Sequence, residues 1–128
     1  MQLTRHTDYA LRLLISLAKT KGERRSIAEI AEEQAISRTH LMKIANRLAH
    51  AGFIEATRGR GGGVRLAQDP AAINLGAVVT EMEPGCSMID CTGCRLLRKC
   101  NLPGVLAGAR RAFFVQLSKN SLADVISA

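Results

Sequence analysis

Residues 26–66 read SIAEIAEEQAISRTHLMKIANRLAHAGFIEATRGRGGGVRL, and they combine two short helical patterns with a hairpin pattern. Ser26 and Glu29 form a capping-box signature, which begins a helix that we expect to reach about Gln34. After a tight break, Ser37 is expected to cap a second helix. The inward stripe of this second helix consists of Leu41, Ile44 and Leu48. Two short helices joined by so brief a turn predict a helix-turn-helix.

The residues after the second helix predict a wing. Gly52 ends that helix, and residues 53–58 and 64–67 have strand composition around the glycine-rich loop 59–63. Glycine lacks a Cβ and tolerates positive φ, so such a loop can approach a phosphate chain closely. The loop lacks the Gly-Lys-Ser/Thr ending of a nucleotide-binding P-loop, and it joins two strands instead of leading into a helix. The wing therefore favours DNA binding over an unrelated helical core.

The charge of this region supports the same interpretation. From Ser37 to Leu66 there are six Lys and Arg residues against a single acidic residue, Glu55. Residues at the start of the second helix would enter the major groove, where Arg38 and Lys43 could donate to guanine. For His40, base reading and a solvent- or phosphate-facing position are both open. The residues expected to contact DNA are Arg38, Thr39, His40, Lys43, Arg47, Arg58, Arg60 and Arg65.

The whole chain has the size and composition of one mainly helical domain. Of its 128 residues 47% are hydrophobic but only 3% are aromatic, so the core must be built from aliphatic side chains, as in packed helices. We expect further helices at 7–19, from Asn74 and at 102–117, with Asn101 as a cap, and a short one after Ser121. The predicted organisation is a winged helix-turn-helix over 1–70, followed over 71–128 by a cysteine-rich loop and a long dimerisation helix. The net charge of +7 favours a polyanionic partner, although a solvated basic surface would also explain it.

Four cysteines between Cys86 and Cys100 provide the second chemical signal. The chain shows no signal peptide, so we expect a cytoplasmic protein, in which reduced cysteines serve as metal ligands more often than as disulfides. Only Cys91-x-x-Cys94 has the spacing of a zinc knuckle. Iron-sulfur clusters accept looser loop spacings, and nearby basic side chains would offset the negative charge of a cluster. These basic residues are Arg95, Arg98 and Lys99. An iron-sulfur cluster is favoured, and zinc stays open.

Motifs over nearly the whole chain resemble the Rrf2 family of winged-helix transcription regulators. They are MQLT at 1–4, TDYALR at 7–12, SRTHLMKI at 37–44, RGRGGG at 58–63, the segment from Glu83-Pro84 to Cys100, and SLAD at 121–124. The resemblance implies an iron-sulfur cluster held by Cys91, Cys94 and Cys100, with four-iron four-sulfur favoured over two-iron two-sulfur. It also implies a fourth ligand, Asp8 from the partner subunit. Cys86 has no family counterpart and is the alternative ligand. The gap between Cys91 and Cys94 is shorter than is usual in the family.

The resemblance also implies a function. It points to a homodimeric repressor, not an enzyme, that binds a pseudo-palindromic operator in double-stranded DNA and senses nitric oxide through its cluster. Cluster-biogenesis regulators of the family carry a His three residues after the last Cys, where this chain has Pro103. Nitric oxide is therefore the favoured signal. The alternatives are a regulator that senses iron or redox status, a zinc-stabilised DNA-binding protein without sensing, and an electron-transfer protein, against which the basic wing argues.

Overall fold

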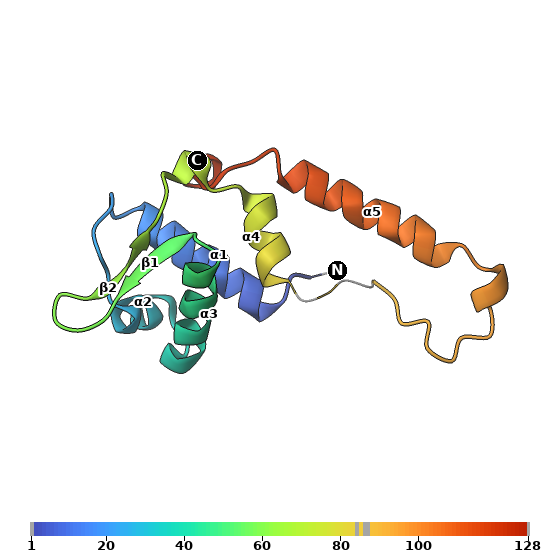
Figure 1. Ribbon diagram of the computed structural model, residues 1–128, viewed down its shortest axis with the longest axis horizontal. Helices are drawn as coiled ribbons and strands as arrows, with labels where there is room; N and C mark the ends of the chain where they lie inside the picture. Colours follow the sequence, from blue (N-terminus) through green and yellow to red (C-terminus); the bar gives the residue numbers. More distant parts are fainter. Residues whose placement is uncertain (1, 84, 86–87, 128) are drawn as a thin grey trace.

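The helices and strands predicted from the sequence are all present in the computed structural model, which describes residues 2–83, 85 and 88–127 (Figure 1). The elements are α1 (Arg5–Ala18), α2 (Ile27–Gln34), α3 (Arg38–His50), β1 (Ile54–Thr57), β2 (Gly63–Leu66), the 3-10 turn η1 (Pro70–Ala72), α4 (Leu75–Met82), the 3-10 turn η2 (Leu97–Lys99), α5 (Leu102–Leu117) and α6 (Leu122–Ile126). The mainly helical winged helix-turn-helix is thus confirmed.

Side-chain caps set where most of the helices begin. Thr4, Ser26, Ser37 and Asn74 each accept a hydrogen bond from the backbone N–H three positions further on, which satisfies one of the free donors of a first turn. The predicted caps of α2, α3 and α4 are confirmed. Asn101 does stand at the cap position of α5, but within the described residues its side chain makes no capping hydrogen bond.

One apolar core joins the first and second halves of the chain. It lies between α1, α2, α3, α4 and α6. Its fully buried members include Leu13, Leu14, Ile30, Leu41, Ile44, Leu48, Val78, Met82 and Leu122. Each such side chain contributes about 1.5–3 kcal/mol by leaving water. By contrast, α5 has no buried residue within the described part of the chain, and it projects from the body in Figure 1.

The wing is anchored to the segment before α2. β1 and β2 are antiparallel, with Ile54 opposite Leu66. At the loop end of the hairpin, where β2 begins, Arg25 and Val64 exchange two backbone hydrogen bonds of 2.9 and 2.8 Å. Gly63 has φ +148°, and a Cβ there would lie 2.6 Å from the Arg25 carbonyl oxygen. Only glycine fits this close approach without displacing the backbone.

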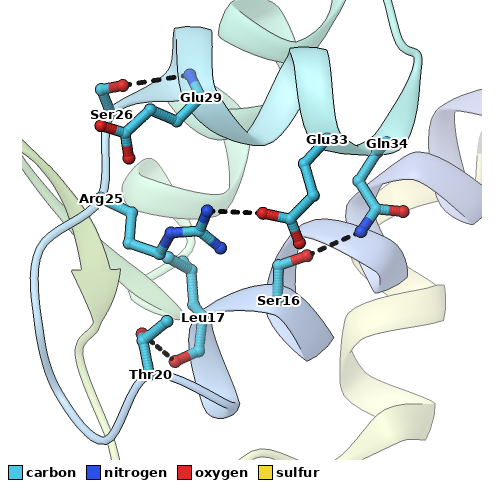
Figure 2. A network of polar contacts seen from close by, with 8 residues as sticks. All are labelled: Ser16, Leu17, Thr20, Arg25, Ser26, Glu29, Glu33 and Gln34. Atoms are coloured by element: carbon cyan, nitrogen blue, oxygen red, sulfur yellow. Dashed lines mark hydrogen bonds and ion pairs between the residues drawn. The ribbon is translucent and has the colours of Figure 1, made fainter.

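The same arginine connects the start of β2 to the helix-turn-helix (Figure 2). The Arg25 guanidinium donates to the Glu33 carboxylate on α2 at 2.6 Å. This hydrogen bond and the positive charge lower the pKa of Glu33. One residue on, Gln34 donates to the Ser16 hydroxyl of α1 at 3.0 Å. Because Glu33 is half-exposed, water weakens the pair, and we expect it to orient α2 and the wing more than to stabilise the fold.

Candidate DNA-binding surface and cysteine segment

The outer face of α3 carries several side chains that are free to meet a ligand. In Figure 1, α3 lies along the lower edge of the molecule and α5 along the upper side. Arg38, Thr39 and Lys43 are exposed, and within the described residues they have no ion pair or side-chain hydrogen bond. These three predicted contacts therefore lie together on an accessible face.

His40 occupies a different position from its predicted neighbours. Its ring is half-buried, lies 6.2 Å from the His6 ring in a stacked arrangement, and meets the Tyr9 ring edge-on at 5.3 Å. His6 and Tyr9 belong to α1, so His40 connects α3 to α1. A base contact by His40 would require these ring contacts to open.

Two outward residues of α3 were missed by the sequence analysis. Met42 is 48% exposed and Asn46 is exposed, and both lie opposite the buried stripe of α3. Asparagine can bind adenine through two hydrogen bonds, and an apolar side chain can contact the methyl group of thymine. The helical spacing that identifies Leu41, Ile44 and Leu48 as buried would have placed both residues on the reading face.

Among the arginines predicted to contact DNA in the wing and at the end of α3, two form ion pairs with glutamates in the described part of the chain and two do not. Arg47 donates to the Glu81 carbonyl oxygen at 2.7 Å, and its Nε lies 3.7 Å from the Glu81 carboxylate. Arg65 pairs with Glu55 at 2.9 Å across the hairpin. Both pairs are half-exposed, so phosphates can compete for these arginines at little cost. Arg58 and Arg60 are exposed and have no such partner within the described residues.

We call residues 84–100 the cysteine segment. Its described part, residues 88–100, runs outward to the far end of α5, away from the wing (Figure 1). Cys91 is half-buried, while Cys94 and Cys100 are exposed, and all three are free thiols. The backbone N–H of Cys94 donates to the Cys91 carbonyl oxygen at 3.1 Å, and the Cys100 sulfur accepts the N–H of Leu102 at 3.4 Å. Cys86 lies outside the described residues.

The three thiols suit an iron-sulfur cluster in chemistry but are not gathered around a common point. Within residues 2–83, 85 and 88–127, no group of three or more His, Cys, Asp or Glu side chains could hold a metal ion. Thiolates on an irregular loop are nevertheless the usual ligands of such clusters. Arg95, Arg98 and Lys99 are exposed on the same loop and could balance the charge. The donor set therefore fits a cluster around which the loop would have to close.

Asp8, the predicted fourth ligand, lies in the first turn of α1. Its carboxylate is half-exposed and pairs with Arg12 at 3.0 Å, one helical turn later. The Arg12 guanidinium also lies over the Tyr9 ring, 5.7 Å from its centre. Asp8 is thus accessible from outside the subunit, and Arg12 is its partner within it.

Glu83 is a further residue that the sequence analysis did not identify as functional. It follows α4 directly, and its carboxylate accepts hydrogen bonds from Thr4 and Thr7 at the start of α1. Burial opposes ionisation here, but these hydrogen bonds outweigh it and lower the pKa of Glu83. No sequence pattern signals a contact between residues 79 positions apart.

The apolar stripe of α5 is shared between two surfaces. Phe113 and Leu117 line a cavity of about 260 Å³ together with residues of α1, α4 and the N-terminal segment. Phe113 therefore faces a surface of its own chain. Towards the start of α5, Leu102 is 49% exposed and Val105 is 61% exposed.

Within the described residues, no helix is long and apolar enough to cross a membrane.

Comparison with known proteins gives consistent matches along the chain. The family described as "Rrf2: Iron-dependent Transcriptional regulator" matches residues 3–128. The HTH-type transcriptional regulator NsrR of Bacillus subtilis is 42% identical over 132 residues, which span 98% of this chain and 90% of that protein. The structure of T. potens IscR has a TM-score of 0.78 at 22% identity, covering 99% of this chain and 87% of that one. Staphylococcus aureus CymR has a TM-score of 0.75 at 25% identity, covering 98% of each chain.

Proposed function

Because this chain belongs to the Rrf2 family of transcriptional regulators, which are not enzymes, we propose that it is a repressor that senses nitric oxide through an iron-sulfur cluster. The observation that carries the proposal is the joint presence of a reading helix with free outward side chains and a loop with three free thiols. The similarity to NsrR over nearly the whole chain supports it.

Cys91, Cys94 and Cys100 would hold the cluster, with four-iron four-sulfur as the favoured type. Asp8 from the partner subunit would supply the fourth ligand, and Cys86 is the alternative. A carboxylate oxygen is a harder ligand than a thiolate and is displaced from iron more easily, which suits a position meant to admit nitric oxide. When bound, the cluster would supply iron to which nitric oxide can bind.

The chain's own residues would convert a change in how Asp8 is held into a change at α3. A displaced Asp8 can return to Arg12, with which it pairs in the structure. Asp8 shares the first turns of α1 with His6 and Tyr9, whose rings contact His40 at the start of α3. Binding of Asp8 to a cluster held by the partner subunit would therefore influence how α3 is presented to DNA.

A homodimer through α5 would complete this arrangement. α5 is 16 residues long, and within the described residues none of its side chains is buried. Its exposed Leu102 and Val105 would be covered by the same helix of a second copy. Two winged helices related by a twofold axis would then read successive major grooves of a pseudo-palindromic operator. This regulator would act in the cytoplasm.

Changing Arg60 to Ala should make operator binding less dependent on salt. When the wing neutralises one phosphate fewer, the slope of log affinity against log salt falls by about one unit. The measurement is operator affinity across a series of salt concentrations. The matched control is Lys119→Ala. Lys119 is an exposed basic residue just after α5, and its replacement should leave the slope unchanged. An unchanged slope for Arg60→Ala would remove the wing from the DNA interface.

Purification without oxygen separates the proposed function from its alternatives. The visible spectrum and the content of iron, sulfide and zinc per chain should show an iron-sulfur cluster. Zinc without iron or sulfide would indicate a zinc-stabilised DNA-binding protein. The description of the family as iron-dependent favours sensing of iron as a second candidate. A cluster that ignores nitric oxide but is lost on iron limitation or oxidation would indicate that candidate or a redox sensor.

A further inference from the structure

A single carboxylate connects the end of α4 to the start of α1. The Thr4 backbone N–H donates to the two Glu83 carboxylate oxygens at 3.2 and 3.3 Å, and the Thr4 hydroxyl donates at 2.9 Å. The Thr7 hydroxyl donates to the same carboxylate, and Thr7 is fully buried. One side chain thus satisfies three donors in the first turn of α1.

The negative charge of Glu83 strengthens this contact. Hydrogen bonds to an ionised acceptor are about twice as strong as those between neutral groups. A negative charge at a helix N-terminus is also favoured by the helix dipole. Because these interactions lower the pKa of Glu83, the carboxylate stays ionised near neutral pH. We call the contact of Glu83 with Thr4 and Thr7 the Glu83 latch.

The latch lies between the two functional parts of the chain. On one side, Glu83 precedes the cysteine segment directly in the sequence. On the other, the first turns of α1 reach α3 through the rings of His6, Tyr9 and His40. The His6 Nε2 atom is buried between these elements and has no hydrogen-bond partner within the described residues. At His6, α1 and α3 therefore touch through the stacked rings of His6 and His40.

We propose that Glu83 is a positioning residue that transmits the state of the cysteine segment to the reading helix α3 of the same subunit. Movement of the cysteine segment would pull on Glu83, shift the first turn of α1, and so shift His40 and the start of α3. This route differs from the one through Asp8, because it does not pass through the partner subunit. The proposal rests on the proposed function, in which the cysteine segment responds to a cluster.

The test compares operator affinity between cluster-loaded and nitric-oxide-treated protein. The duplex is one selected by the loaded parent protein from a random library. The ratio of the two affinities measures the coupling. Glu83→Ala should reduce this ratio roughly 2- to 30-fold, the effect expected of a residue within a coupling network. A merely structural role would lower thermal stability, or weaken both affinities equally, and leave the ratio unchanged.

Three further variants make the result specific. Thr7→Val removes the donor on the other side of the latch with little change in volume, so it should reproduce the effect even if Glu83→Ala folds poorly. Glu83→Gln keeps an acceptor oxygen and should restore part of the ratio. Glu81→Ala removes a carboxylate two residues earlier, whose partner is Arg47, and should leave the ratio near that of the parent.

The possible failures are distinguishable. If the parent responds to nitric oxide while Glu83→Ala and Thr7→Val keep its ratio, the latch has no role in coupling and the proposed function stands. If the parent holds a cluster but binds the operator equally before and after nitric oxide, the proposed function fails, and the role of Glu83 fails with it.

Discussion

Replacing Cys91, Cys94 or Cys100 with serine should eliminate the iron-sulfur cluster and the response of operator binding to nitric oxide. The three thiols are on one loop, and each would supply one ligand. A serine hydroxyl is a poor substitute, because it stays almost fully protonated, whereas a cysteine thiol readily loses its proton to solvent when it binds a metal. Iron and sulfide per chain, together with the visible spectrum, measure the loss after purification without oxygen.

The fourth ligand can be assigned with the same measurements. Cys86→Ser should keep iron, sulfide and the nitric oxide response near those of the parent. Asp8→Ala should retain a cluster but alter its spectrum and its coupling to operator binding, since one oxygen ligand is removed. A colourless Cys86→Ser protein, together with an Asp8→Ala protein that matches the parent, would reverse the assignment.

Changing Ala109 to Glu should convert the dimer to monomers and weaken operator binding. Ala109 is exposed and lies seven residues after Leu102, on the stripe of α5 that we expect to face the second copy. A twofold interface would bury the new carboxylate twice, and an unpaired buried charge costs several kcal/mol. Each 1.4 kcal/mol weakens association about tenfold. Sedimentation at a concentration where the parent is dimeric measures the effect.

Ala107→Glu provides the control for this substitution. Ala107 is also an exposed alanine of α5, but it lies about 200° around the helix from Ala109, away from the stripe. The two variants have the same charge and helix propensity, so they differ only in the face that is changed. Neither residue lines the cavity that Phe113 shares with α1 and α4. Dimers from Ala109→Glu as stable as those from Ala107→Glu would place the interface elsewhere.

The sequence predicted those parts of the fold that depend on local patterns. The caps Ser26, Ser37 and Asn74 were correct, because a cap and the N–H it accepts are three residues apart. The buried stripe of α3 was correct for the same reason. All four strand limits differed from the expected ones by one residue, because pairing fixes where a strand stops.

Contacts between distant segments could not be predicted in this way. Nothing local shows that Arg25 joins β2 to Glu33, or that Glu83 accepts hydrogen bonds from Thr4 and Thr7. The same holds for His40, whose helical position is compatible both with solvent and with the α1 surface. For the cysteines, the sequence identifies donors, but their arrangement would depend on the group that they bind.

Operator binding before and after nitric oxide tests the central claim most directly. The protein is purified without oxygen, its iron and sulfide are assayed, and its affinity for a selected operator duplex is measured at fixed salt. Stoichiometric nitric oxide is then added and the affinity is measured again. The proposed function predicts loss of the cluster spectrum and a fall in operator affinity of roughly 5- to 150-fold, the usual range of allosteric coupling. An unchanged affinity in protein that has lost its cluster spectrum would contradict it.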